Sequence, residues 1–279
     1  MTSFNTLGLS EPLLRAVDKL GFSAPTPVQE QVIPLVAAGH DVVAEAQTGS
    51  GKTAAFALPL LQQLAADPPL APVVRVLVLV PTRELALQVA AAFKSFAVFQ
   101  PSAPRVLAVI GGQPIEGQVE ALSKGIDIVV ATPGRMLDLV VNGHVQLSEL
   151  RTLVLDEADK LLDLGFADEL KAILATVAPD RQTLLFSATL PAKVLALQQR
   201  TQRDSVTVRI DAAQVGVEGI AQRVFEVDRN NRRPLLQHLI GSESWGQTLI
   251  FVATQRATEN LASKLRRDGV TAAALHGGL

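Results

Sequence analysis

Three carboxylates stand together where an apolar run ends, in the segment TLVLDEADKLLD at residues 152–163. They are Asp156, Glu157 and Asp159, here called the acid cluster. Carboxylates crowded at the edge of an apolar core repel one another and resist the loss of water. The cluster therefore indicates a cation, a bound water or a hydrogen-bonding partner held nearby.

A glycine-rich segment, AEAQTGSGKT at residues 44–53, follows another apolar run and opens a helical pattern. In this setting backbone N–H groups and a helix N-terminus converge on an anion, as in phosphate-binding loops. Gly49 and Gly51 allow the backbone to approach phosphates closely. Lys52 is expected to reach the terminal phosphates, and the Thr53 hydroxyl to bind Mg²⁺. The predicted nucleotide-binding residues of this phosphate loop are Ala46 (where the general pattern begins with glycine), Gln47, Thr48, Gly49, Ser50, Gly51, Lys52 and Thr53.

The predicted phosphate loop suggests roles for two residues of the acid cluster, Asp156 and Glu157. In nucleotide-hydrolysing proteins of this kind, an acid that ends a neighbouring strand holds Mg²⁺ through water. Asp156 is placed for that role, and Glu157 is placed to orient or deprotonate the water that attacks the γ-phosphate. The alternatives are an ordinary helix-start turn with an unrelated lysine, and a solvated group of acids at a helix N-terminus. The predicted catalytic residues are Lys52, Asp156 and Glu157, and the predicted metal ligands are Thr53 and Asp156.

The elements that must position these residues follow a regular alternation. Between most of the apolar runs lie helical patterns of ten residues or more, such as 53–66 and 83–96. Near-continuous apolar strands that alternate with helices predict an α/β fold, a parallel sheet covered on both faces. In such sheets ligands lie at the carboxyl ends of the strands, and the polar segments here come directly after strands. Strands are predicted at 41–46, 76–80, 105–110, 126–131, 152–157, 183–188 and 205–210.

The chain is predicted to contain two domains, at residues 1–210 and 220–279, joined by a linker at 211–219 (DAAQVGVEG). Two and a half β/α units cannot cover both faces of a sheet, so the second domain is expected to be incomplete. Its predicted strands are 222–228, 247–254 and 271–275, and its predicted helices are 233–241 and 257–269.

Composition excludes several classes of protein. The 279 residues include 48% hydrophobic and 19% charged residues, which is typical of globular proteins. The absence of cysteine excludes disulfides and thiolate metal sites, and the four histidines are scattered. There is no secretory signal and no apolar stretch long enough to span a membrane, so the cytoplasm is the expected location. A net charge of −2 argues mildly against nucleic acid as a partner.

A series of short segments follows in this order along the chain: GFSAPTPVQ (21–29), AQTGSGKT (46–53), PTRELALQ (81–88), GG (111–112), TPGR (132–135), the acid cluster, SAT (187–189) and LIFVATQR (249–256). In type and order these segments resemble the motifs of the DEAD-box family of ATP-dependent RNA helicases. The short N-terminus is similar to that of the bacterial RhlE-like branch. The resemblance implies a RecA-like first domain, an incomplete second RecA-like domain, and ATP and Mg²⁺ as cofactors. It implies RNA-stimulated ATP hydrolysis that drives local, sequence-independent unwinding or remodelling of RNA–protein complexes.

The resemblance also implies roles for single residues. Gln29 would hydrogen-bond the adenine edge, and Phe22, with Phe4 behind it, would pack against the base. A coupling bridge of hydrogen bonds would join Asp159, Ser187 and Thr189. Phe22 as a core aromatic, and the Ser/Thr pair as a turn, are the alternatives. The implied RNA-binding residues are Thr82, Arg83, Gly111, Gly112, Thr132, Pro133, Gly134 and Arg135.

This set of RNA contacts is compatible with the net charge of −2, which by itself argues against a nucleic-acid partner. Backbone amides, hydroxyls and helix N-termini bind phosphates without a large positive charge, and such contacts do not depend on base sequence. The resemblance therefore implies RNA as the partner of a monomer without a membrane anchor. It also suggests ribosomal or degradosome-type proteins as further partners.

The C-terminal end departs from the family. Gly278 stands where the family has aspartate, and the chain stops before the motifs whose arginines close on the γ-phosphate, so impaired turnover is expected. Three readings stay open. They are an ATP-dependent RNA helicase, a non-catalytic fragment that binds nucleotide and RNA, and, as the weakest, a DNA translocase or another P-loop ATPase.

Overall fold

The structure is a computed structural model that describes residues 3–67, 73–210, 221, 223–243 and 245–278. The chain divides into two compact units, residues 1–217 (unit 1) and 218–279 (unit 2). The linker predicted at 211–219 lies outside the described residues.

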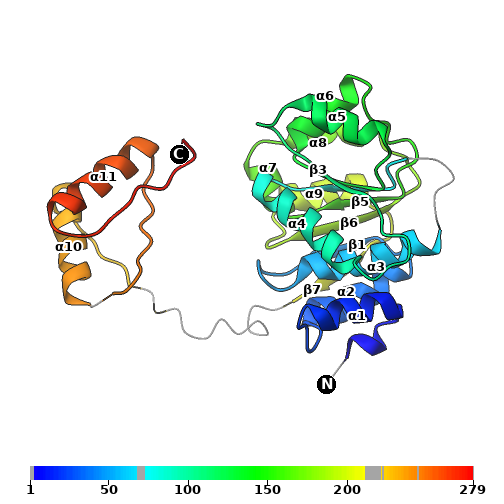
Figure 1. The fold of residues 1–279 in the computed structure, drawn as a ribbon, viewed down its shortest axis with the longest axis horizontal. Coiled ribbons are helices and arrows are strands. Elements are labelled where there is room, and N and C mark those ends of the chain that lie inside the picture. The colour runs from blue at the N-terminus through cyan, green and yellow to red at the C-terminus, as the bar shows by residue number, and fades with distance from the viewer. Residues whose placement is uncertain (1–2, 68–72, 211–220, 222, 244, 279) are drawn as a thin grey trace. The chain divides into compact units, whose positions relative to one another are not determined.

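Unit 1 is built on a seven-stranded sheet in the order β3-β4-β2-β5-β6-β1-β7 (Figure 1). Every neighbouring pair is parallel. The predicted α/β class is therefore confirmed, and each of the seven predicted strands is present. The strands are β1 (Val42–Glu45), β2 (Val76–Leu79), β3 (Val106–Val109), β4 (Ile128–Ala131), β5 (Thr152–Leu155), β6 (Gln182–Ser187) and β7 (Val206–Arg209).

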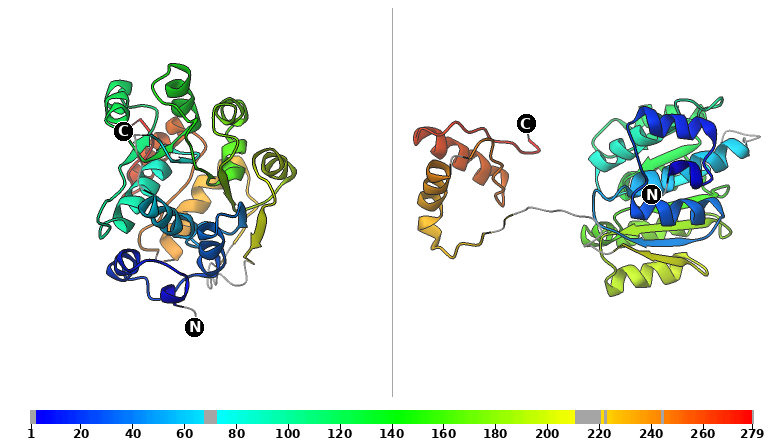
Figure 2. Two further views of the ribbon diagram at one scale, coloured as in Figure 1. Left: turned by 90° about the vertical axis from the view of Figure 1, so that its right-hand side faces the viewer. Right: turned by 90° about the horizontal axis from the view of Figure 1, so that it is seen from below.

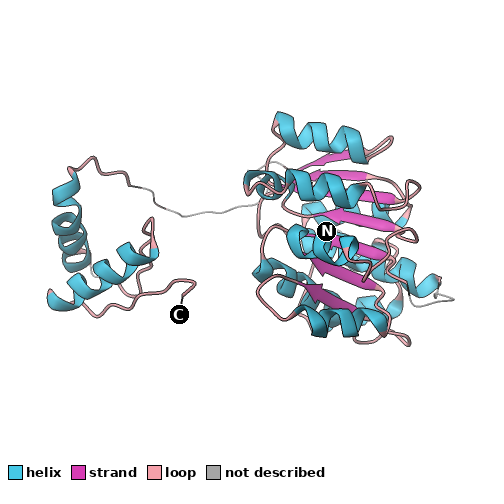
Figure 3. Cartoon of the chain, turned by 90° about the horizontal axis from the view of Figure 1, so that it is seen from above, coloured by secondary structure: helices cyan, strands magenta, loops and turns pink. Residues whose placement is uncertain are grey.

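Helices cover both faces of this sheet (Figure 3). A short 3₁₀ turn, η1 (Phe4–Thr6), precedes them. None of the described helices is both long enough and apolar enough to cross a membrane. The helices are α1 (Glu11–Lys19), α2 (Pro27–Ala37), α3 (Lys52–Ala66), α4 (Arg83–Phe96), α5 (Ile115–Ser123), α6 (Pro133–Val141), α7 (Ala158–Asp163), α8 (Ala167–Leu174) and α9 (Ala192–Thr201).

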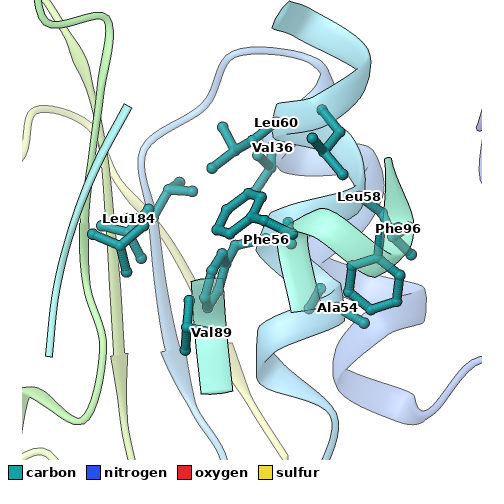
Figure 4. Close-up of a cluster of buried hydrophobic side chains, with 14 of the residues drawn as sticks. Val36, Ala54, Phe56, Leu58, Leu60, Val89, Phe96 and Leu184 are labelled. Carbon is teal, nitrogen blue, oxygen red and sulfur yellow. The ribbon is translucent and has the colours of Figure 1, made fainter. Parts of the chain in front are cut away.

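Alternation along the strands divides the core into two layers. In β1, Val42 and Ala44 join the cluster packed by α1 to α4, whereas Val43 joins the cluster packed by α6 to α9. Figure 4 shows part of the first cluster, in which Phe56 of α3 is fully buried. The Phe56 ring lies 5.2 Å from that of Phe186, between ring centroids. This packing holds α3 against the sheet and so fixes the position of the loop that precedes it.

The sheet brings the predicted motifs together, because the carboxyl ends of parallel strands all lie along the same side of the sheet. Neighbouring strands β5, β6 and β1 are followed by the acid cluster, the SAT segment and the phosphate loop. Neighbouring strands β3, β4 and β2 are followed by GG, TPGR and PTR. The pair β2·β5 lies at the border of the two groups, where the N–H of Asp156 donates to the carbonyl of Leu79 at 3.0 Å.

Unit 2 contains the two helices predicted for it, coloured orange and red in Figure 2, but not the predicted strands. Within its described residues, 223–228, 247–254 and 271–275 form no strand, so this prediction was wrong. A β-strand exists only where its backbone pairs with a neighbour, and these segments have none among the described residues. Val224 and Phe251 are accordingly 98% and 88% exposed. The elements present are η3 (Arg229–Asn231), α10 (Arg232–Ser242) and α11 (Gln255–Arg267).

Candidate nucleotide site and adjoining groove

The phosphate loop joins β1 to α3, as the sequence predicts. Gly49 and Gly51 have φ angles of +84° and +94°, in the left-handed region that glycine adopts without strain. Residues 47–49 are exposed, whereas Ser50 and Lys52 are buried. The tip of the loop is therefore open to a ligand while its base is anchored in the protein.

Lys52 lies inside the curve of the loop. Its Nζ donates to the carbonyl oxygens of Ala46 at 2.6 Å and Gln47 at 2.9 Å. Burial lowers the pKa of Lys52, and the nearby acid cluster opposes this change, with Asp156 as the strongest of the three acids. The structure therefore brings the predicted lysine and the predicted acids into one electrostatic site.

Asp156 is a buried carboxyl at the end of β5, only 3% exposed. Burial raises its pKa to about 6, and the attraction of Lys52 opposes the rise. Its Oδ1 accepts one hydrogen bond, from the N–H of Glu157 at 2.9 Å. The positive charge of Lys52 therefore offsets the burial of Asp156 only in part, and a further cation nearby would favour the ionised form of this carboxyl.

Glu157 has φ +50° and ψ +51°, a left-handed conformation that costs a residue other than glycine about 1–2 kcal/mol. Backbone strain of this kind clusters at functional sites. Its carboxylate accepts from Nζ of Lys160 at 2.9 Å. The strained turn places this second acid at the start of α7, next to Asp156.

The donors at this site suit Mg²⁺. The Thr53 hydroxyl, in the first turn of α3, and the Asp156 carboxylate are oxygen ligands, which Mg²⁺ prefers. Mg²⁺ usually keeps several waters and binds to one or two carboxylates together with substrate phosphates. Among the described residues, no group of three or more His, Cys, Asp or Glu side chains could enclose a metal ion. These residues therefore fit an ion held jointly by protein, phosphate and water.

Gln29 is tied to the phosphate loop itself, which sequence reasoning did not anticipate. Its side chain is 3% exposed. Oε1 accepts from the N–H of Thr26 at 3.0 Å, and Nε2 donates to the carbonyl of Gly51 at 3.1 Å. The adenine contact stays a prediction, but this side chain already joins the start of α2 to the start of α3.

Phe22 is partly exposed and stands beside two other aromatic rings. Its ring centroid lies 6.4 Å from that of Phe4 and 6.1 Å from that of Phe96. Its exposed fraction is 38%, so part of the ring is free to meet a ligand. Phe4 does lie beside Phe22, whereas the contact of Phe22 with the base stays a prediction.

Asp159, Ser187 and Thr189 form a connected network of hydrogen bonds. Oδ2 of Asp159 accepts from the N–H of Thr189 at 3.2 Å and from its hydroxyl at 3.0 Å. The Ser187 hydroxyl accepts from the N–H of Asp159 at 3.3 Å and donates to the carbonyl of Thr189 at 2.6 Å. The network joins the end of β6 to α7, and its role in coupling stays a prediction.

We expect Asp159→Ala to lower the free energy of unfolding by about 2 kcal/mol, because a buried carboxylate that accepts charge-assisted hydrogen bonds is removed. Urea denaturation measures the change. Asp163→Ala is the matched control on the same helix, since the Asp163 side chain is 62% exposed and, among the described residues, pairs with Lys193 alone. The control should change the free energy by less than about 0.5 kcal/mol. Equal effects of the two substitutions would contradict a structural role for the network.

A groove of about 460 Å³ lies beside the nucleotide site and gathers most of the predicted RNA-binding residues. The guanidinium of Arg83 lies against the glycine pair that follows β3, so that a Cβ added at Gly112 would collide with it. Arg135 donates from both terminal nitrogens to the carbonyl of Gln113, at 3.1 and 3.0 Å. The residues that line the groove are Pro81, Thr82, Arg83, Glu84, Gly111, Thr132, Gly134, Arg135 and Phe166.

Some details of the groove differ from the residues predicted for it. Pro133 does not line it but is buried as the first residue of α6, a position that suits the fixed φ of proline. Pro81 and Glu84 line the groove and were not singled out, although both lie inside the quoted PTRELALQ segment. Phe166 was missed because only its tertiary position, after α7, brings it there.

The fold and site define a class of protein. A parallel sheet with a phosphate loop after β1, and acids after β5, which is separated from β1 only by β6, is a RecA-like nucleotide-binding domain. Residues 26–197 match the family model described as DEAD/DEAH box helicase. The chain belongs to this family.

Relatives named as RNA helicases agree with that assignment. The chain is 43% identical to ATP-dependent RNA helicase DeaD of Escherichia coli (strain K12), over 100% of this chain and 44% of that protein. It is 38% identical to DEAD-box ATP-dependent RNA helicase CshA of Geobacillus kaustophilus, over 100% of this chain and 59% of that protein. The chain thus spans about half the length of these relatives. The expected RhlE-like branch is not confirmed by them.

A solved structure shares the fold. The crystal structure of a DEAD box protein from the hyperthermophile Methanococcus jannaschii matches with a TM-score of 0.71 and 37% sequence identity. The match covers 100% of this chain and 74% of that one. The RecA-like fold predicted from the resemblance is therefore confirmed.

Proposed function

We propose that this protein is an ATP-dependent RNA helicase, in which RNA-stimulated ATP hydrolysis drives local unwinding of RNA or remodelling of RNA–protein complexes. The observation that carries the proposal is that the phosphate loop, the acid cluster and the groove all follow the carboxyl ends of strands in one parallel sheet. Membership of the DEAD/DEAH box family supports it, as do relatives named ATP-dependent RNA helicases.

The residues of the nucleotide site have distinct tasks in this proposal. Thr53 and Asp156 would hold Mg²⁺, which would supply positive charge to the phosphate oxygens of ATP. Lys52 exchanges its two loop carbonyls for phosphate oxygens. Ser50, whose hydroxyl is buried without a partner among the described residues, offers the loop a further donor. Glu157 orients the attacking water and accepts its proton.

The proposal links hydrolysis to RNA through the Asp159–Ser187–Thr189 network. Asp159 lies two residues beyond Glu157, on the first turn of α7. A shift of the acid cluster on hydrolysis would therefore change the hydrogen bonds to Thr189. Side-chain networks of this kind transmit changes because their members are held together by directional bonds.

The groove would bind the RNA backbone without reading its sequence. Arg83 and Arg135 supply positive charge, while glycine N–H groups and the N-termini of α4 and α6 suit phosphates. Phosphate and sugar contacts carry no base information, so binding should be independent of sequence. RNA is preferred over DNA in the proposal because the relatives are named RNA helicases.

We expect Arg83→Gln to weaken the binding of single-stranded RNA about tenfold, since one phosphate contact is lost. The slope of log affinity against log salt should become shallower by about 0.7. Fluorescence anisotropy over a salt series measures both quantities. Arg105→Gln is the control with the same change in charge. Arg105 lies just before the first residue of β3, at the amino ends of the strands, whereas the groove lies at their carboxyl ends. Equal losses in both variants would show that overall charge, and not the groove, governs binding.

The experiment that tests the proposed function compares ATP turnover with no nucleic acid, with single-stranded RNA and with single-stranded DNA. Stimulation by RNA above that by DNA, absent from the Glu157→Gln blank, is the expected result. Nucleotide binding without turnover would favour the non-catalytic fragment instead. Equal stimulation by DNA would favour a DNA translocase.

The same proposal includes the setting in which the protein acts. A cytoplasmic monomer that works on RNA bound to ribosomal or degradosome-type proteins would need no membrane anchor. Analytical ultracentrifugation tests the oligomeric state, and a dimer at micromolar concentration would contradict this part of the proposal.

A further inference from the structure

Two arginines that line the groove take their positions from one short loop. This loop, residues 111–114, is called the GG loop. The guanidinium of Arg83 lies so close to the GG loop that a Cβ at Gly112 would collide with it. The guanidinium of Arg135 donates two hydrogen bonds to the carbonyl of Gln113. A movement of the GG loop would therefore displace both positive charges of the groove.

One buried side chain holds both ends of the GG loop. Gln118, on α5, is 5% exposed and does not line the groove. Its Oε1 accepts from the N–H of Ile110 at 3.1 Å, and its Nε2 donates to the carbonyl of Ile110 at 3.1 Å. The same Nε2 donates to the carbonyl of Pro114 at 3.4 Å. The Gln118 amide thus hydrogen-bonds the N–H and the carbonyl of Ile110, just before the GG loop, and the carbonyl of Pro114, at the end of the loop.

The position of β3 explains why this side chain is needed. β3 is an edge strand, so it has a neighbour, β4, on one side only. Beyond the end of β3, Ile110 is 3% exposed, and its buried N–H and carbonyl need partners. The Gln118 amide, which carries both a donor and an acceptor, supplies them in place of a neighbouring strand.

We propose that Gln118 is a positioning residue for the groove, holding the GG loop so that Arg83 and Arg135 face the RNA backbone. It acts through the loop and does not itself touch RNA. The inference rests on the proposed function, since it assumes that the groove binds RNA. Without the amide, Ile110 would seek other hydrogen-bond partners, and the loop would move with it.

The test uses Gln118→Leu, which preserves most of the volume but neither donates nor accepts. We expect binding of a labelled oligouridine to weaken about tenfold, with a shallower dependence on salt, as phosphate contacts are lost. Affinity for ATP should be unchanged. Gln100→Leu is the matched control, because Gln100 is also buried and donates to the carbonyl of Leu61, away from the groove. We expect the control to change RNA affinity by less than about twofold.

Two further measurements separate positioning from general loss of structure. The amide proton of Ile110 should exchange faster in Gln118→Leu than in the Gln100→Leu control, since only the former loses its acceptor. In a double-mutant cycle, Gln118→Leu combined with Arg135→Ala should weaken RNA binding by less than the product of the single effects. Independent effects would overturn the inference.

The variant Gln118→Glu covers the case in which leucine prevents folding. Glutamate keeps the size and can accept from the N–H of Ile110, but it cannot donate to either carbonyl when ionised. It is expected to weaken RNA binding severalfold while ATP binding persists. If the unaltered protein does not bind RNA, the proposed function fails, and this inference with it. If the unaltered protein binds RNA and both Gln118 variants bind it equally well, only the inference on Gln118 fails.

Discussion

Replacing Glu157 by glutamine should reduce RNA-stimulated ATP turnover by about 10²–10⁴-fold, the usual contribution of a general base. Glutamine has the same length and can still orient a water, but it does not accept a proton near neutral pH. ATP binding should persist, because Lys52 and the phosphate loop are unchanged. The measurement is turnover at saturating ATP and RNA, together with nucleotide affinity.

The stability of this variant should be almost unchanged. The left-handed backbone at residue 157 costs glutamine about as much as glutamate. Within the part of the chain that the structure describes, the Glu157 side chain pairs only with Lys160, whose side chain is 51% exposed, and such pairs contribute about 0–1 kcal/mol. Lys160→Gln is the control, since it breaks this ion pair and leaves the proposed base in place. Turnover in Glu157→Gln within tenfold of the unaltered protein would remove Glu157 from the catalytic residues.

Gly51→Ala should lower the free energy of unfolding by about 2–4 kcal/mol. A methyl group at Gly51 would collide with the side-chain amide of Gln29 and crowd the Thr26 hydroxyl. In addition, φ at residue 51 is +94°, which only glycine adopts without strain. Moving Gln29 aside would break its hydrogen bond to the Gly51 carbonyl. Urea denaturation of the nucleotide-free protein measures the loss, and ATP affinity should also fall more than tenfold.

Gly49→Ala is a closely matched control for this prediction. Gly49 also has a positive φ, +84°, but a Cβ there has no atom within 4 Å. Gly49→Ala should therefore lower the free energy of unfolding only by the cost of placing alanine in a left-handed conformation, about 1–2 kcal/mol. Gln29→Ala should rescue part of the loss in the Gly51→Ala background, because it removes the obstructing amide. Equal destabilisation by the two glycine substitutions, without rescue, would show that Gln29 does not constrain the loop.

The nucleotide site was predictable from sequence to the extent that its signals are local. Gly49, Gly51 and Lys52 lie within four residues, and their spacing after a strand and before a helix indicates a phosphate loop. The bond from Gln29 to the Gly51 carbonyl was not predictable, since it joins residues that are 22 apart along the chain. The inward turn of Lys52, onto the carbonyls of its own loop, likewise depends on the folded loop.

The hydrophobic pattern of the sequence predicts the β-strands of unit 1 correctly but not those of unit 2. In unit 1 the apolar runs, such as VLVLV at 76–80, became strands because neighbours on both sides pair with them. In unit 2, LIFVAT at 249–254 has an equally strong strand pattern, yet forms none. Strand propensity describes a side-chain environment, whereas a strand also requires hydrogen-bonded neighbours.

By itself, the sequence determined the local features of this protein: seven strands of unit 1, the helices between them, the phosphate loop and the order of the family motifs. Only the tertiary structure decided that β5, β6 and β1 are neighbours, that the GG loop packs under Arg83, and that Gln118 supports it. Local features follow from backbone sterics and side-chain periodicity within a few residues. The neighbours of a strand, by contrast, are set by the packing of the whole sheet and its two layers of helices, which no short segment encodes.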